Sequence, residues 1–182
     1  DRILGSAEKP HLIITADCGS SDEERICRLK NSAIEVIVTD HHMIPHEGIP
    51  QSAAATVNPN RQDCSYPDKF ISGCMVSWLL MCSVRNNLIS KKYLNENTNK
   101  LAFLLDFVAL STVADAVSFF SATNRAVVNS GLAIINQRSK PSWCALASFI
   151  NRPHSVPFTA EDLAFQVAPR VNARSRMADP YA

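Results

Sequence analysis

The chain has 182 residues, a length that allows a globular domain with a sizeable hydrophobic core. Hydrophobic residues make up 46% of the chain and charged residues 19%, which is the ordinary balance of a folded globular protein. The formal net charge is only +1, so any nucleic-acid site has to come from local clustering of basic residues.

Membrane association and structural zinc are both disfavoured by the sequence. The longest apolar runs, near residues 12–14 and 101–105, are far too short to cross a bilayer. Six cysteines are present, and none form a C-x-x-C pair of the kind that holds structural zinc. We therefore expect buried free thiols in a reducing compartment, and hence a cytoplasmic protein.

The first half of the chain alternates strand patterns with a helix pattern. Residues 12–15 and 36–39 are short apolar runs typical of buried parallel strands, and residues 54–57 predict a third strand. Residues 20–24, Ser-Ser-Asp-Glu-Glu, predict a capping box for a helix that runs to residue 30. This order of strand, helix and strand favours a parallel β-α-β unit.

The second half of the chain has helical patterns throughout. They predict helices over residues 73–88, 99–114, 124–138 and 141–150, and a last helix that Thr159 caps and Pro169 ends or kinks. A polar gap at residues 89–98 suggests a boundary between an α/β part, residues 1–90, and a helical part, residues 91–182. The predicted fold is α/β, with a parallel sheet flanked by helices and followed by a mainly helical segment.

Acidic and imidazole side chains follow two of the predicted strands. Asp17 comes after the first strand, and Asp40, His41 and His42 come after the second. Ligands of open α/β sheets bind outside the carboxyl ends of the strands, so these residues would converge on one crevice. Carboxylate and imidazole together suit Mn²⁺, Fe²⁺ or Zn²⁺ better than Ca²⁺, and Gly19 would let the backbone approach a bound anion. An ordinary turn Asp and a polar His-His loop remain open alternatives on the spacing alone.

A further carboxylate ends an apolar helix. Asp115 follows the apolar segment at residues 101–114, where an anion is disfavoured by the helix dipole and by burial. A nearby cation would explain it, whereas a water-exposed residue after the helix end would need no explanation. Both interpretations stay open.

The C-terminal stretch is locally basic. Arg170, Arg174 and Arg176 lie within seven residues, with Asn172 and Ser175 between them. Guanidinium groups bind phosphate oxygens in a bidentate manner, so the cluster is a candidate phosphate site. A solvated surface loop is the alternative.

Several segments, in their order along the chain, resemble motifs of the DHH-family phosphoesterases, and in particular of their RecJ-like exonuclease branch. Residues 12–19 resemble the family's second motif, and residues 36–42 resemble the Asp-His-His motif that names the family. Further similar segments occur in family order at residues 57–60, 63–67, 72–73, 109–115, 124–125, 131–132, 165–173 and 176–177.

The resemblance implies metal-dependent hydrolysis of phosphodiester bonds with two divalent ions, Mn²⁺ or Mg²⁺. It implies that Asp17 is shared between the two metal ions and that His41 and Asp115 are further metal ligands. His42 would stabilise charge on the scissile phosphate, and Asp40 would orient a histidine from behind. This branch removes nucleotides from a 5′ end of single-stranded DNA during repair and recombination.

The same resemblance implies that Arg170, Asn172 and Arg176 hold substrate phosphates. The pattern around residues 173–176 departs from the small, glycine-containing pattern of the family. The family's first Asp-rich motif belongs several tens of residues before Asp17, yet only sixteen residues precede it here. We therefore expect part of the metal cage and the C-terminal substrate-binding domain to be absent, and the 182-residue chain alone to show little or no nuclease activity.

Two other functions are compatible with the same motifs. A DHH-family phosphatase would act on pyrophosphate, short oligonucleotides or cyclic dinucleotides, although the RecJ-like segments after residue 73 disfavour it. A degenerate scaffold that binds DNA or a replication partner would usually lose metal ligands, whereas Asp17, His41, His42 and Asp115 are all present.

Overall fold

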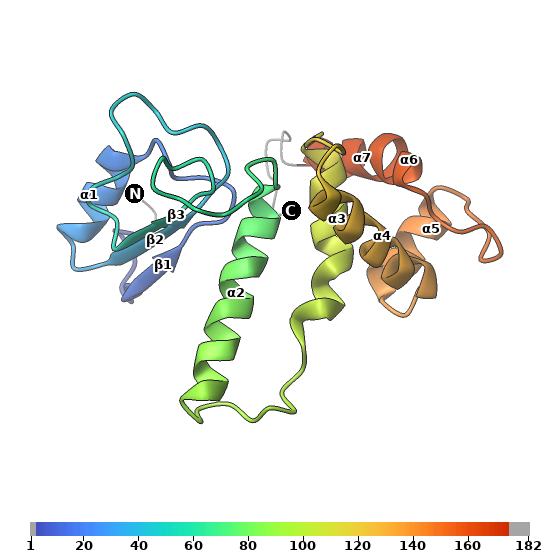
Figure 1. Ribbon diagram of the computed structural model, residues 1–182, viewed down its shortest axis with the longest axis horizontal. Coiled ribbons are helices and arrows are strands. Elements are labelled where there is room, and N and C mark those ends of the chain that lie inside the picture. Colours follow the sequence, from blue (N-terminus) through green and yellow to red (C-terminus); the bar gives the residue numbers. More distant parts are fainter. Residues whose placement is uncertain (1–2, 175–182) are drawn as a thin grey trace. The chain divides into compact units, whose positions relative to one another are not determined.

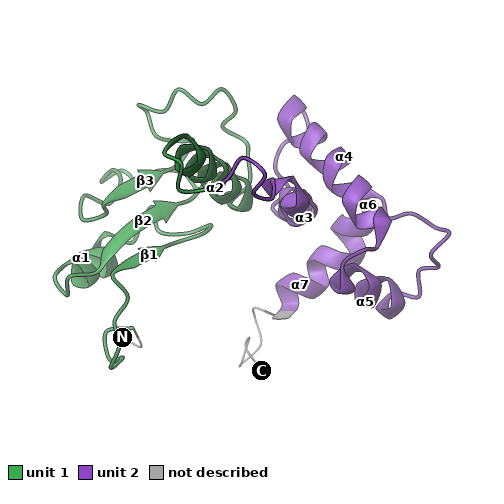
Figure 2. Ribbon diagram, turned by 90° about the horizontal axis from the view of Figure 1, so that it is seen from below, with its two compact units in different colours: residues 1–94 green, residues 95–182 purple. Residues whose placement is uncertain are grey.

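The structure is a computed structural model that describes residues 3–174. The chain divides into two compact units, residues 1–94 and residues 95–182 (Figure 2).

The first unit is built on a three-stranded parallel sheet (Figure 1). Its strands are β1 (Leu12–Ile14), β2 (Glu35–Thr39) and β3 (Ala55–Val57), in the order β1-β2-β3. Two helices belong to the unit, α1 (Glu23–Lys30) between the first two strands and α2 (Gly73–Ser90) after the third. Because the strands are parallel, their carboxyl ends lie at one edge of the sheet.

The three strands differ in burial because of their places in the sheet. β2 is central, and its Val36 and Val38 pack with Ile26 of α1 in a small core. β1 lies at an edge of the sheet, and its Leu12 and Ile14 are 46% and 56% exposed. The prediction of a buried first strand is therefore wrong for β1, since an apolar run does not distinguish a central strand from an edge strand.

Helix α1 begins differently from the prediction. Its N-cap is Asp22, and no side chain makes the capping hydrogen bond, so the predicted capping box is absent. The carboxylate of Glu23 instead accepts hydrogen bonds from the backbone N–H and hydroxyl of Ser52. Ser20 is buried at the edge of the sheet, where it takes part in the site described below.

The second unit is helical. It contains η1 (Leu101–Leu104), α3 (Leu105–Ala114), α4 (Ala122–Gln137), α5 (Pro141–Phe149), α6 (Ala160–Asp162), η2 (Leu163–Val167) and α7 (Ala168–Arg174). Its core gathers side chains from α3, α4, α5, η2 and the loop before α6 around Trp143. A parallel sheet with helices, followed by a helical part, confirms the predicted α/β fold class.

The helix before Pro169 does not end there, so of the two predicted outcomes, an end or a kink, the first is wrong. Thr159 caps α6 in a full capping box with Asp162, and the chain continues through the π-helical turn η2 into α7. Pro169 is the second residue of α7, where a missing N–H breaks no α-helical hydrogen bond of the new helix. Arg170 and Asn172 therefore lie on a helix rather than in a loop.

Two other expectations concern membranes and thiols. Within residues 3–174, no helix is long and apolar enough to cross a membrane. All six cysteines are free, but none of them is fully buried, and Cys18 and Cys144 are exposed. The prediction of free thiols is confirmed, and the prediction of their burial is wrong.

Candidate metal centre

Three potential metal ligands meet at the carboxyl edge of the sheet. Asp17, His41 and His42 each offer a ligand atom, and these atoms lie within 4.8 Å of one another. Asp17 comes from the segment after β1, and the two histidines follow β2 directly. The backbone N–H of Asp17 donates to the carbonyl of Thr39 at 3.0 Å, which ties the two strand ends together.

Asp17 has an unusual backbone conformation. Its φ is +63°, in the left-handed region that Asp tolerates better than most residues. Its side chain lies against Gly73, the first residue of α2, where an added Cβ would meet Asp17 Oδ1 at 2.1 Å. The glycine therefore leaves the space that the carboxylate occupies.

The ring of His41 is fixed by hydrogen bonding at one nitrogen. Nδ1 lies 2.8 Å from the carbonyl oxygen of Ile71, which can only accept, so Nδ1 carries a hydrogen. In the neutral ring, Nε2 then presents a lone pair, and it lies 3.2 Å from Asp17 Oδ1. Two acceptor atoms this close are stable only with a proton or a cation between them, which fits a metal ion.

His42 is held from behind by a buried carboxylate. Asp40 is 2% exposed, and its Oδ1 lies 2.7 Å from His42 Nδ1. It also accepts from the backbone N–H groups of Ser20, His41 and His42. Burial alone would raise the pKa of Asp40, but the hydrogen bonds from His42 and Ser20 outweigh it and lower the pKa to about 2. Asp40 is therefore a carboxylate at neutral pH, and Nε2 is the nitrogen of His42 that faces away from it.

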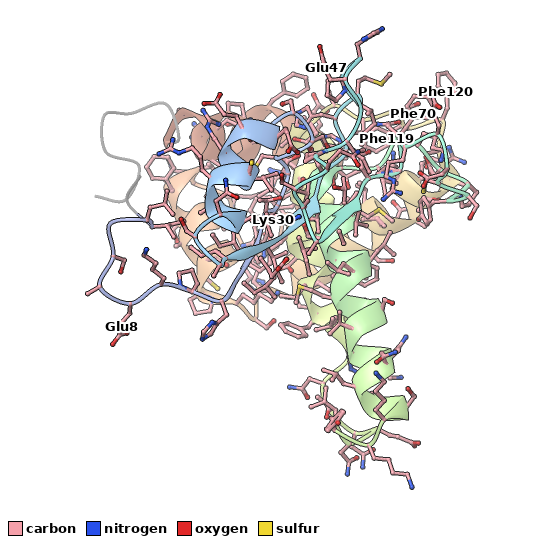
Figure 3. All side chains as sticks on the ribbon, turned by 90° about the vertical axis from the view of Figure 1, so that its left-hand side faces the viewer. Glu8, Lys30, Glu47, Phe70, Phe119 and Phe120 are labelled. Atoms are coloured by element: carbon pink, nitrogen blue, oxygen red, sulfur yellow. The ribbon has the colours of Figure 1, made fainter. Side chains whose placement is uncertain are left out.

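The surroundings of the cluster are electrostatically negative. Partial burial of the sulfur, followed by the charges of Asp40, Asp22 and Asp17, raises the pKa of the Cys18 thiol. Burial disfavours a charge of either sign, so it is the negative charges of these three carboxylates that favour a cation here. Glu47, in the loop after His42, is exposed at the outer end of that loop (Figure 3) and is not part of the cluster.

Gly19 has a packing reason to be glycine. It is buried with a φ of +114°, and an added Cβ would lie 3.1 Å from both Thr15 Oγ1 and Val38 Cγ1. Its expected contact with a bound anion stays a prediction.

Asparagine residues after β3 complete the edge of the sheet, and the sequence analysis assigned them no role. Asn58 donates to Ser20 Oγ and to the carbonyl of His42, each at 2.9 Å. Asn60 donates to the carbonyl of His41 at 2.6 Å. The rule that found Asp17 and Asp40, polar residues at the carboxyl end of a strand, applies to these asparagines as well.

The remaining predicted site residues belong to the second unit or lie outside the described residues. Asp115 follows α3, is exposed, and accepts from Ser111 Oγ at 3.2 Å. Arg170 on α7 is exposed; it donates to the carbonyl of Gln166 and lies 5.7 Å from the centroid of the Phe149 ring. Asn172 is exposed on the same helix, and Arg176 lies outside residues 3–174.

Comparison with known proteins gives the family. The DHH family, N-terminal domain, matches residues 2–112, which include the whole cluster. The chain belongs to the DHH family. Among curated DHH relatives, it is 39% identical over 177 residues to the single-stranded-DNA-specific exonuclease RecJ of Salmonella typhimurium, and 37% identical to that of Escherichia coli. Each alignment covers 95% of this chain and 30% of the relative, so the chain spans about a third of these proteins.

Solved structures agree with this assignment. A crystal structure of exonuclease RecJ bound to manganese superposes with a TM-score of 0.77 at 28% identity, covering 98% of this chain and 42% of that one. RecJ from Thermus thermophilus in complex with Mn²⁺ gives a TM-score of 0.70 at 29% identity, covering 93% of this chain and 24% of that one. The DHH fold of the chain is therefore that of these enzymes.

Proposed function

We propose that this DHH chain is the metal-binding part of an exonuclease that hydrolyses phosphodiester bonds in single-stranded DNA. The observation that carries the proposal is the His41 ring, whose Nδ1 bonds Ile71 so that Nε2 faces the Asp17 carboxylate. Relatives that are named single-stranded-DNA-specific exonucleases support the choice of substrate.

The metal is Mn²⁺ or Mg²⁺ in this proposal, as in the similar RecJ crystal structures. Asp17 and His41 are its ligands, and Asp115 is a further ligand that the family resemblance implies. An imidazole beside a carboxylate suits Mn²⁺ better than Mg²⁺. When bound, the ions supply Lewis acidity and a water of lowered pKa.

The protein's own groups hold and orient the substrate. His42 lies beside the scissile phosphate and stabilises its charge, because the Asp40 carboxylate holds Nδ1 and turns the opposite edge of the ring outward. The backbone at Gly19 contacts a substrate oxygen. Arg170, Asn172 and Arg176 bind phosphates further along the strand.

The cellular setting follows from the same proposal. We place the enzyme in the cytoplasm, which its free thiols support, and assign it to DNA repair and recombination with 5′-to-3′ polarity.

The experiment compares substrates in the gene's full-length product. A 5′-labelled single strand and a dinucleotide are incubated with Mn²⁺, and products are followed over time. Loss of nucleotides from the long strand is expected, whereas cleavage of the dinucleotide alone would assign the chain to the small-substrate phosphatases.

The Asp17→Ala variant tests the ligand. Removal of a metal-bridging carboxylate should abolish turnover, and binding of DNA without turnover by the parent protein would indicate a scaffold instead. Turnover that survives in Asp17→Ala would refute the role of this carboxylate.

A further inference from the structure

The two asparagines after β3 hydrogen-bond the backbone of both histidines of the metal centre, and neither carries a charged or imidazole group. Asn58 is 2% exposed, so its amide has to find partners within the protein. Its Oδ1 accepts from the backbone N–H of Asn60 at 2.8 Å, which shows that its NH₂ faces the other way.

The NH₂ group of Asn58 closes a ring of hydrogen bonds. It donates to Ser20 Oγ and to the carbonyl of His42. The backbone N–H of Ser20 donates to Asp40 Oδ2 at 2.9 Å, and Asp40 Oδ1 lies 2.7 Å from His42 Nδ1. The ring thus runs from Asn58 through Ser20 and Asp40 to His42 and back to Asn58.

This ring joins the carboxyl ends of all three strands. Ser20 follows β1, Asp40 and His42 follow β2, and Asn58 follows β3. Asn60 adds a second contact to the segment of residues 40–42, because its Nδ2 donates to the carbonyl of His41. The backbone carbonyls of both histidines are therefore held by side-chain amides from the segment after β3.

We propose that Asn58 and Asn60 are positioning residues of the metal centre, which set the backbone of His41 and His42 and thereby aim their rings. The inference rests on the proposed function and extends it to residues that touch neither metal nor substrate. Asn58 orients His42 along two routes, through its carbonyl and through Asp40. Partners of this kind alter metal affinity or activity by about tenfold to a hundredfold when they are removed.

A structural role alone would give a different result, and a matched asparagine separates the two. Asn136 in the second unit also makes two side-chain hydrogen bonds to backbone, donating to the carbonyl of Phe158 and accepting from its N–H. Asn136→Ala therefore removes a similar pair of bonds that involves none of residues 40–42. Any general loss of stability should be seen in both variants.

The experiment measures Mn²⁺ affinity by electron paramagnetic resonance for this chain and for Asn58→Ala, Asn60→Ala, Asn136→Ala and Asp17→Ala. The Kd for Mn²⁺ should rise about tenfold or more in Asn58→Ala and by a smaller factor in Asn60→Ala. It should stay unchanged in Asn136→Ala, although the melting temperature falls there. In the full-length product, Asn58→Ala should lower kcat while KM for single-stranded DNA stays within about twofold of the parent value.

The possible results distinguish a failure of the positioning role from a failure of the proposed function. Parent-like Mn²⁺ affinity in a folded Asn58→Ala, together with lost affinity in Asp17→Ala, would overturn the positioning role alone. Unchanged affinity in Asp17→Ala would overturn both proposals. If Asn58→Ala does not fold, Asn60→Ala decides, because Asn60 is only half-buried and contacts the His41 carbonyl directly.

Discussion

The substitution Gly73→Ala should damage the metal centre while leaving the fold intact. Gly73 is the first residue of α2, and a Cβ there would lie 2.1 Å from Oδ1, 2.6 Å from Cγ and 2.7 Å from Cβ of Asp17. Atoms do not pack at these distances, so the Asp17 side chain has to move by about 1 Å. The side chain is 44% exposed, so its carboxylate can swing toward solvent, whereas its Cβ moves only with the backbone, which has to shift slightly as well.

The effects on stability and on metal binding should therefore differ. Alanine is a better helix residue than glycine by up to about 1 kcal/mol, which offsets part of the cost of moving Asp17. We expect the free energy of unfolding to change by no more than about 1 kcal/mol. A misplacement of about 1 Å at a metal ligand should weaken Mn²⁺ binding roughly tenfold to a hundredfold.

A second glycine provides the opposite control. In Gly131→Ala, the added Cβ would lie 2.2 Å from the Ala109 Cβ and 2.5 Å from the Leu105 carbonyl oxygen, in the packing of α4 on α3. This variant should lose stability and keep Mn²⁺ affinity. Thermal unfolding and Mn²⁺ titration of both variants should show weaker Mn²⁺ binding in Gly73→Ala and lower stability in Gly131→Ala. Mn²⁺ affinity within about twofold of the parent in Gly73→Ala would show that Asp17 does not bind the ion from this position.

Three other substitutions test stability. Asp40→Asn should lower the free energy of unfolding by about 2 kcal/mol at neutral pH, because the pKa of Asp40 is lowered from 3.8 to about 2 in the folded protein. This contribution is present above about pH 4 and is lost as the pH falls toward 2. The unfolding free energy of the parent should therefore decline over that range, and that of the variant much less. Asp106→Asn should destabilise the second unit by about 3 kcal/mol in urea unfolding, because the fully buried carboxylate pairs with Lys140 and accepts from Trp143; a loss below about 1 kcal/mol would contradict this. Thr159→Ala should lower stability by about 1 kcal/mol through loss of the capping box, with no change in Mn²⁺ affinity.

Much of the sheet edge could be predicted from the sequence, because apolar runs and the polar residues that follow them are local patterns. Short apolar runs predicted three parallel strands, and the structure contains them at nearly the same residues. Parallel strands place their carboxyl ends together, so Asp17 and His41 were expected to be close, and the structure brings them together. Their roles as metal ligands stay predictions.

What the sequence did not indicate depends on contacts between distant residues. Asp106 lies in an apolar helix and is fully buried, and its partners Lys140 and Trp143 are 34 and 37 residues further along the chain. No periodic pattern predicts such a pair. The capping box expected near Ser20 is absent as well: α1 begins after Asp22, and Ser20 is instead held by Asn58, 38 residues away.

The conformation of Asp17 explains why a pattern of residue types is not enough to define this site. A non-glycine residue with φ near +63° costs about 1 to 3 kcal/mol and persists only where its surroundings impose the conformation. Here the backbone N–H bonds Thr39, and the carboxylate fills the space left by Gly73, so residues of two other segments impose the conformation. The identity of Gly73 therefore depends on Asp17, 56 positions earlier in the chain. A DHH-type motif with alanine at the start of α2 would keep its Asp and His residues and still fail to place the carboxylate opposite His41 Nε2.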